Sequence, residues 1–407
     1  PFHIKAMSNE AYEYAHMYGQ FHWGISAWAF YVPAIAAISY MLYKRNSKSV
    51  KISNTLVPLF GKKIETSWIG KIIDSIVSLG IVASITTSLG LGVPVMSELI
   101  ADTFKIKQSI WLQLFVFFVW FVIFGWSVFR GMDNGIKKLT SVNMYIIFAF
   151  LIAFFLVSPM NDIIRMEMNS VGLYLDKLPR MMFNTDPFGN QKFVNDWTMF
   201  YWGWWLIFIP IMGMFVAKIS RGRTLKQVLL GQMIWGSLGC CTFLGILGGY
   251  SLYLQKHGIV DLVSIVEKEG NGKAVLAIMQ TLPLSKLFIV VLIVLCFVFL
   301  ATTIDSTAMV LGSATSTGLH PDEDPHLYNR FSWAIAIFAL AIALSFTGGL
   351  QLVQRFAIVL GFPLIFIAGL MSISVLKAMK EDYGNKTKEE ITKLENTLEI
   401  KRKKESL

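Results

Sequence analysis

A dense run of aromatic side chains lies between positions 195 and 215, in NDWTMFYWGWWLIFIPIMGMF. On a helix that turns about 100° per residue, several of its large side chains would share an arc of roughly 100°. These are Trp197, Tyr201, Trp204, Trp205, Phe208 and Met212, while Trp202 would lie apart. Aromatic residues also gather in belts at membrane interfaces, but a belt sits at helix ends and this run continues to mid-helix. The pattern therefore favours a ring-lined binding face, with an interfacial belt or plain packing as the alternative.

A second aromatic stripe lies in the earlier stretch FHWGISAWAFY. Trp23, Trp28 and Tyr31 would project within an arc of roughly 140° on one helix. Two such helices facing each other would form a box of rings. The negative faces of aromatic rings bind cations, and a quaternary ammonium suits them because it has no N–H to donate. Two independent packing faces are the alternative interpretation.

A third stretch, FLATTIDSTAM, places hydroxyl groups in an apolar segment. The hydroxyls of Thr302, Thr303 and Ser306 are oxygen ligands of the kind that Na⁺ takes in transporter sites. Hydroxyls in membrane helices also bond back to the carbonyl one turn earlier, which is the alternative. Asp305 strengthens the functional interpretation because an intramembrane carboxylate is costly, although it could simply form a structural pair.

Other marked positions carry weaker signals. Gly90, Gly92 and Pro94 predict a helix stop in preference to a broken helix. Glu98 has no evident partner in the sequence, and His22 is expected to be packed and neutral. No glycine-rich phosphate loop, HExxH motif or nucleophile elbow is present, so the sequence indicates a protein that is not an enzyme. The three cysteines, expected to be inert buried thiols, are Cys240, Cys241 and Cys296.

The composition is that of an integral membrane protein. Of 407 residues, 55% are hydrophobic and 15% are charged, and the mean hydropathy is +0.57. Chains of this kind belong in a bilayer. The formal net charge of +10 comes from short loops and the C-terminal tail, where it sets orientation by the positive-inside rule. Nucleic-acid binding is therefore not expected.

About nine transmembrane helices are predicted from the apolar segments. They cover about 20–43, 69–91, 110–129, 139–157, 195–215, 228–252, 287–315, 331–344 and 356–375. The segment 158–194 is expected to carry an amphipathic surface helix. Basic loops follow alternate spans, which predicts a cytoplasmic C-terminus. We expect one transport domain over 1–377 and a charged cytoplasmic tail over 378–407. Because Pro1 is not Met and no signal pattern precedes the first span, N-terminal helices are expected to be missing.

The motifs together resemble a known transporter family. FHWGISAWAFY, NDWTMFYWGWW followed by ISRGRT, and FLATTIDS, in that order, are similar to the betaine/choline/carnitine transporters. The resemblance spans about 11–383. It implies an all-α integral membrane protein with a five-plus-five inverted-repeat, sodium-symporter-like fold, in which these spans are the fourth to twelfth. It also implies a homotrimer in the plasma (cell) membrane.

The resemblance assigns roles to individual residues. Trp23, Trp28, Tyr31 and Trp205 match the aromatic box for a trimethylammonium group. Further matches are Trp204 and Phe208 along the access path, Phe299, Thr302 and Thr303 at a sodium site, and Met212 at a thioether position of sodium-independent exchangers. The family's sodium site commonly has Ser where Thr303 stands. The wording ATTIDS and Met212 lean toward the exchanger branch. The exchangers have an Arg where this chain has Asn143, and this difference leans toward sodium coupling.

The resemblance therefore implies a secondary active transporter of quaternary ammonium compounds such as glycine betaine, choline or carnitine. No cofactor is expected beyond a possible coupling Na⁺. A sodium-independent substrate exchanger of the carnitine type is the alternative. A channel, which would need a continuous polar pore, and a membrane-embedded osmosensor are two further classes that the sequence leaves open.

Overall fold

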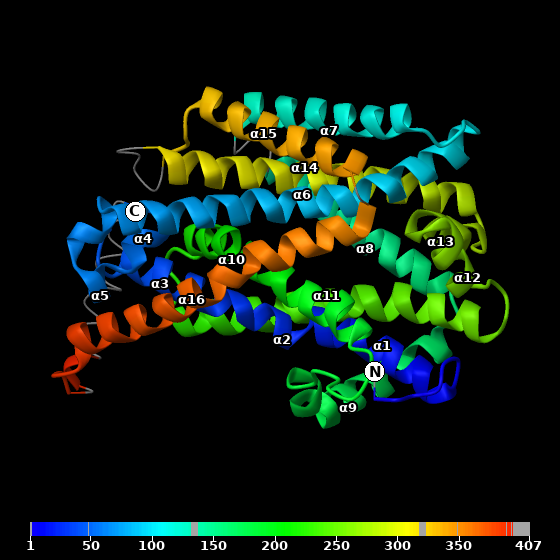
Figure 1. Cartoon of the computed structure of the whole chain (residues 1–407), viewed down its shortest axis with the longest axis horizontal. Coiled ribbons are helices and arrows are strands. Elements are labelled where there is room, and N and C mark those ends of the chain that lie inside the picture. The colour runs from blue at the N-terminus through cyan, green and yellow to red at the C-terminus, as the bar shows by residue number, and fades with distance from the viewer. Residues whose placement is uncertain are drawn as a thin grey trace.

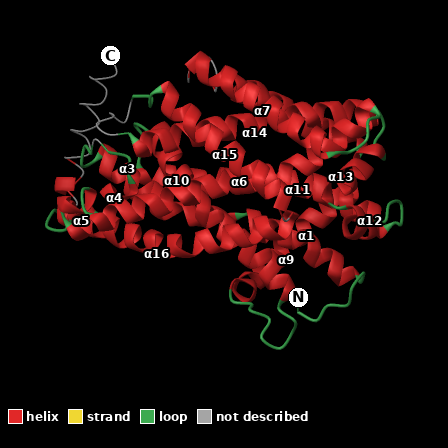
Figure 2. Ribbon diagram, turned by 45° about the horizontal axis from the view of Figure 1, so that its top comes forward, coloured by secondary structure: helices red, strands yellow, loops and turns green. Residues whose placement is uncertain are grey.

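The computed structural model describes residues 2–47, 49–131, 137–316, 323–347, 349–387, 389–391 and 393, and these residues form helices and loops with no strand (Figure 2). The helices before position 105 are α1 (Asn9–Trp23), α2 (Ile25–Trp28), η1 (Ala29–Tyr31), α3 (Val32–Tyr43), α4 (Ile52–Thr55), α5 (Val57–Phe60), η2 (Lys62–Glu65) and α6 (Trp68–Phe104). Those up to position 256 are α7 (Ile110–Gly131), α8 (Lys137–Val157), α9 (Met160–Met182), η4 (Val194–Met199), α10 (Phe200–Ile219) and α11 (Leu225–Lys256). The last are α12 (Leu262–Glu269), α13 (Asn271–Gln280), α14 (Ser285–Thr315), α15 (Leu327–Thr347) and α16 (Gly349–Tyr383).

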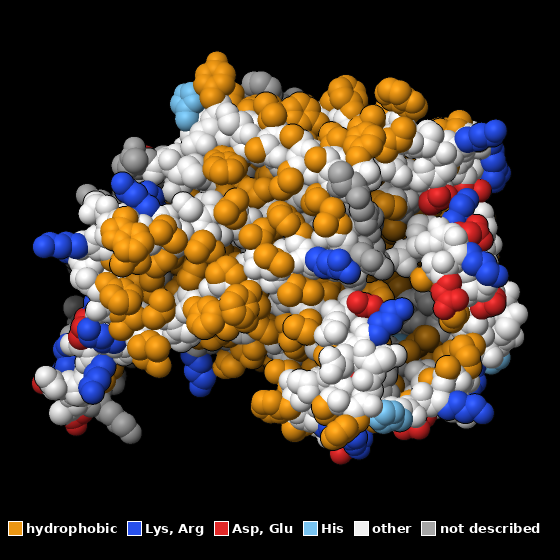
Figure 3. Space-filling view, in the orientation of Figure 1, with side chains coloured by type: hydrophobic (Ala, Val, Ile, Leu, Met, Phe, Trp, Pro, Cys, Tyr) orange, Lys and Arg blue, Asp and Glu red, His pale blue; other side chains and the backbone are white. Residues whose placement is uncertain are grey.

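Within these described residues, nine helical segments are long and apolar enough to cross a membrane. Most of them run along the long axis of the molecule (Figure 1). Figure 3 shows apolar side chains spread over the face of the bundle, and large residues such as Trp111, Tyr145 and Trp235 are more than two-thirds exposed. Such a surface is stable only against lipid or another apolar partner. The predicted all-α membrane fold is confirmed, as is the amphipathic surface helix, which is α9.

The first span differs from the continuous helix that we predicted. The segment Asn9–Tyr43 is interrupted at Gly24, whose ψ of −150° takes the chain out of the helix after α1. The short helix α2 and the 3₁₀ turn η1 then lead into α3. Trp23, Trp28 and Tyr31 therefore lie on both sides of a broken helix, so a single helical wheel does not describe their directions.

The second span also differs from its prediction, which ended the helix near Gly90. The predicted stop is wrong: α6 continues through Gly90, Gly92 and Pro94 to Phe104. Helix α6 packs against α14 and α16, and tertiary packing of this kind overrides weak local propensity. Glu98, in the continuation of α6, does have a partner, because its carboxylate lies 3.0 Å from the ammonium of Lys273 in α13.

At the centre of the bundle, α10 and α16 pack on each other, and α3 and α6 each pack on both of them. Helices α10 and α16 approach closely at Gly203 and Gly361. A Cβ atom on Gly361 would lie 2.7 Å from the carbonyl oxygen of Gly203. Glycine at both positions therefore lets the backbone of the tryptophan-rich helix lie directly against α16, which fixes the position of α10.

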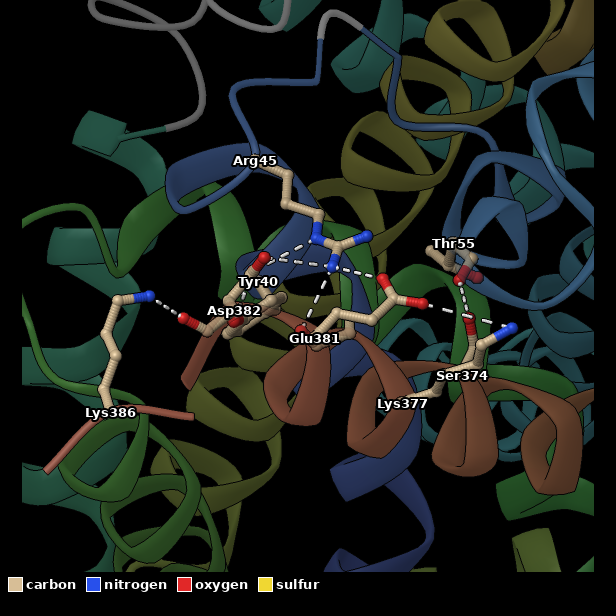
Figure 4. A network of polar contacts seen from close by, with 9 residues as sticks. Tyr40, Arg45, Thr55, Ser374, Lys377, Glu381, Asp382 and Lys386 are labelled. Atoms are coloured by element: carbon tan, nitrogen blue, oxygen red, sulfur yellow. Dashed lines mark hydrogen bonds and ion pairs between the residues drawn. The ribbon is translucent and has the colours of Figure 1, made fainter. Parts of the chain in front are cut away.

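The end of α16 is tied to the first span by polar contacts (Figure 4). The guanidinium of Arg45 lies 2.7 Å from Glu381 and 3.1 Å from Asp382, and the hydroxyl of Tyr40 donates to Asp382 at 2.7 Å. Helix α16 continues to Tyr383, past position 378, where we expected the tail to begin. Residues 394–407 of the predicted tail lie outside the described residues.

Candidate functional site

Trp205 is the centre of the aromatic site. It lies in the first half of α10 and is only 4% exposed. Its indole N–H donates a hydrogen bond of 2.8 Å to the carbonyl oxygen of His22, in the last turn of α1. A buried indole nitrogen needs such an acceptor. This bond fixes the orientation of the Trp205 ring relative to the break in the first span.

The rings of the predicted box come together around Trp205. Its ring centroid lies 5.4 Å from that of Trp23, 5.9 Å from that of Trp28 and 5.3 Å from that of Tyr31. Trp28 and Tyr31 also contact each other edge to face at 5.6 Å. All four residues that the resemblance assigned to the box are thus neighbours, although they come from two separate spans.

The Trp28 ring packs directly on α11. A Cβ atom on Gly236 would lie 2.4 Å from two ring atoms of Trp28, so the indole rests directly on the α11 backbone. One turn earlier, the side-chain amide of Gln232 donates to the carbonyl oxygen of Trp28 at 3.3 Å. Helix α11 therefore forms the outer wall of the box, a role that the sequence did not suggest.

Trp204 and Trp202 lie on different sides of α10, as the helical wheel predicted. Trp204 contacts Trp23 at 5.0 Å and Phe208 at 5.3 Å, next to the box. Trp202 points elsewhere and packs on Phe21 at 5.1 Å. The indole nitrogen of Trp204 is buried and has no acceptor among the residues that the structure describes. Met212 is partly buried and packs on the hydrophobic core.

A cavity of about 500 Å³ lies beside the box. Trp23 belongs to both the cavity and the box. The other aromatic side chains that line the cavity are Tyr14, Tyr18, His22, Phe193, Trp197 and Tyr201. This volume is in the range of small-molecule sites. Trp197 lies on the six-residue π-helical turn η4, a widened turn that is frequent at functional sites, and this turn explains why it lines the cavity rather than the box.

His22, which we expected to be packed and neutral, is buried between these two features. Its ring stacks on Tyr201 at 4.8 Å, and its Nε2 lies 3.1 Å from the hydroxyl of Thr198. Its backbone carbonyl is the acceptor for Trp205. His22 therefore links the cavity wall to the box through its ring and its carbonyl.

The proposed ion ligands lie on α14, away from these rings in sequence. The hydroxyls of Thr302 and Thr303 both donate to the carbonyl oxygen of Phe299, at 2.8 and 2.9 Å. This is the back-bonding that we weighed as the alternative. Each hydroxyl oxygen still has lone pairs to offer, so the three residues form a compact set of oxygen atoms on one face of α14. The Phe299 side chain is more than half exposed.

Asp305 is engaged in a buried ion pair. Its carboxylate accepts from the Arg330 guanidinium of α15 at 2.7 Å and from the Ser127 hydroxyl of α7 at 2.5 Å. The two charged side chains are 0% and 4% exposed. This arrangement corresponds to the structural pairing that we considered, and it joins three helices.

The sequence did not predict the cavity or the packing of Trp28 on Gly236. The ring-lined cavity could not be read from one helical wheel because its walls come from the segment before α1, from α1, from Phe193 and η4, and from α10 and α11. One signal in the sequence was Gly236, within GQMIWGSLGCC, because small residues in membrane helices permit close approach.

The family model described as "BCCT, betaine/carnitine/choline family transporter" matches residues 1–384. The match covers every membrane-spanning helix described above and both ring-bearing spans. The chain therefore belongs to the betaine/carnitine/choline transporter family.

Proposed function

We propose that this protein is a secondary active transporter that holds the trimethylammonium group of its substrate among Trp23, Trp28, Tyr31 and Trp205. It would expose this site alternately to the two sides of the membrane. Membership in the family supports transport of betaine-, carnitine- or choline-type substrates and a role other than catalysis. The observation that carries the proposal is the convergence of three rings on Trp205 at 5.3 to 5.9 Å.

The chemistry of the box matches the substrate class. A quaternary ammonium carries its charge on methyl groups and cannot donate a hydrogen bond, so it gains more from π faces than from carboxylates. A cation–π contact is worth about 0.5–1 kcal/mol when exposed and about 2 kcal/mol or more when water is excluded. Since Trp205 and Tyr31 are both 4% exposed, water is excluded from this site and the larger value applies.

The box must open before it can bind. The rings touch one another, so a trimethylammonium group can enter only when they separate. The cavity beside Trp23 supplies a route of suitable size, with Trp23 lying between cavity and box. We propose that Trp204, which contacts Trp23 at this edge of the box, and Phe208, which packs on Trp204, line the last part of the path.

The coupling mode has two candidates. Sodium symport would use the oxygen atoms of Phe299, Thr302 and Thr303, and it is supported by their clustering on one face of α14. Sodium-independent exchange would use the thioether of Met212, two helical turns after Trp205 on the same helix. Asn143 is buried and its side-chain oxygen has no partner among the described residues. An uncharged residue there is the feature that favours symport.

The experiment is uptake of labelled betaine, choline and carnitine into proteoliposomes that contain the complete protein. Uptake that requires a sodium gradient supports symport, and a Thr302→Val variant should then need a higher sodium concentration for half-maximal uptake. Uptake that ignores sodium but rises with substrate loaded inside supports exchange. Saturation at high substrate concentration separates both from a channel. No uptake of any of the three compounds would contradict the proposed substrate class.

We further propose a homotrimer in the plasma membrane with a cytoplasmic C-terminus. The family resemblance supports the trimer, and the basic loops after alternate spans support the orientation. Mass measurement of the purified protein in nanodiscs tests the first. Protease access to a C-terminal epitope in sealed vesicles of known orientation tests the second.

A further inference from the structure

A polar cluster lies where α1, α9 and α11 meet. These three helices all pack on one another, and both views show α9 against α1 (Figures 1 and 2). Its members are His16 and Gln20 of α1, Glu167 and Ser170 of α9, and the carbonyl of Gly245 in α11. None of them belongs to the box or to the proposed ion site.

His16 is the centre of this cluster and is almost completely buried. Its Nδ1 lies 2.5 Å from the hydroxyl of Ser170. Its Nε2 lies 3.4 Å from the carbonyl oxygen of Gly245 and 4.0 Å from a carboxylate oxygen of Glu167. Both ring nitrogens therefore face α9 or α11, and the second nitrogen faces a carboxylate that is just beyond hydrogen-bonding distance.

Glu167 is poorly satisfied where it stands. Its Oε2 is buried with no hydrogen-bond partner among the described residues. It sits where a Cβ atom on Gly245 would be only 2.5 Å away, so the glycine makes room for the carboxylate. Gln20, 1% exposed, likewise has neither side-chain atom hydrogen-bonded within the described part of the chain. A buried polar group without a partner is costly, and several in one place indicate a ligand.

The smallest ligand that completes this cluster is a proton. One proton shared between Nε2 of His16 and Oε2 of Glu167 would give this unpartnered carboxylate oxygen a charge-assisted hydrogen bond. The side chain of Glu167 is 28% exposed, so protons from solution can reach it. Burial raises the pKa of Glu167. Among the residues that the structure describes, the thiol of Cys241 in α11 also faces Glu167.

We propose that His16 and Glu167 form a proton-binding site whose occupation fastens the surface helix α9 to α1. The rest of the interface fits this role. The buried side chains of α9 are Ile163, Ser170, Tyr174 and Met181, on the face that also carries Glu167. The hydroxyl of Tyr174 donates to Ser26, immediately after the break in the first span. The proton would thus set how firmly α9 holds the helix that carries Trp23.

The test compares apparent unfolding temperatures of the complete protein, in detergent, across the acid to neutral range. The matched variants are Glu167→Gln, which keeps the shape but cannot titrate, and Asp176→Asn, on the exposed side of α9. A group with a raised pKa stabilises the fold below its unfolded-state pKa, and this stability is lost as pH rises through the folded-state pKa. The wild type and Asp176→Asn should therefore lose stability over this range, and Glu167→Gln should not show that loss. Equal pH profiles in all three proteins would overturn the proposal.

Two further measurements test the pairing itself. His16→Gln should move the midpoint of the pH profile to lower pH, because the proton loses its second base; an unchanged midpoint would remove His16 from the site. Spin labels at Glu13 of α1 and Leu175 of α9, both exposed, should report a narrow distance distribution at acid pH and a broader one at neutral pH. The same labels in Glu167→Gln should give no pH dependence. A pH-independent distribution in the wild-type background would show that proton binding does not fasten α9.

Discussion

The indole nitrogen of Trp205 lies 2.8 Å from the carbonyl oxygen of His22, to which it donates. That carbonyl is available because α1 ends one residue later, at Trp23, and the last carbonyls of a helix have no partner within the helix. The break at Gly24 therefore does two things. It redirects the chain so that Trp28 and Tyr31 face Trp205, and it exposes the acceptor that fixes the Trp205 ring.

Trp204 supplies the first prediction. Its buried indole N–H has no acceptor among the described residues, and it lies beside the box through Trp23. A zwitterionic substrate with its trimethylammonium in the box could place its carboxylate there. We expect Trp204→Phe to weaken betaine binding by about 1.5–3 kcal/mol, the usual value for a hydrogen bond to a charged group, and to leave choline binding nearly unchanged. Equal losses for both ligands in equilibrium binding would contradict this role.

Gly236 supplies the second prediction. Adding a methyl group there would push the Trp28 ring, whose atoms lie 2.4 Å from the expected Cβ position. We expect Gly236→Ala to weaken substrate binding severalfold with little change in expression. Gly239→Ala is the matched control, because the same substitution on the same helix meets no atom within 4 Å. Both variants gain similar helix propensity, so a selective loss of binding in Gly236→Ala measures the displacement of Trp28. Similar substrate binding by the two variants would show that the position of the Trp28 ring on α11 does not affect binding.

The buried pair of Asp305 and Arg330 supplies the third prediction. Removing one partner of such a pair leaves a buried charge uncompensated and costs about 3–5 kcal/mol. We expect Asp305→Asn to lower the apparent unfolding temperature strongly, and Arg330→Met combined with it to recover much of the loss. The coupling between the two substitutions, measured as a double-mutant cycle, checks this. Additive losses would mean that the 2.7 Å contact contributes little.

The sequence predicted the ring-bearing face of α10 because helical spacing is a local property, but the single wheel drawn for the first span was wrong because that span breaks at Gly24. Trp205 and Trp202 fall on different sides of α10 in the structure, as the wheel required, and the nine spans were recognisable from their length and hydropathy. It did not predict that α6 passes through Pro94, because packing of α6 against α14 and α16 outweighs the local cost.

Long-range partners were also out of reach of the sequence. The acceptors and counter-ions of Trp205, Glu98 and Asp305 all come from other helices. A single sequence carries no information about which helices adjoin. The proton-binding cluster was invisible for the same reason, since His16 and Glu167 meet only when α9 packs on α1.

The most direct test of the central claim is equilibrium binding of choline and of its neutral tert-butyl analogue to wild type, Trp205→Ala and Trp202→Ala. The two variants remove the same side chain from the same helix, but only Trp205 contacts the box. We predict that Trp205→Ala loses about 1–2 kcal/mol of choline binding, roughly tenfold, and with it the preference for the cation over the neutral analogue. Trp202→Ala should keep that preference. A cation preference that survives in Trp205→Ala, or that is lost equally in Trp202→Ala, would contradict a cation–π box at this site.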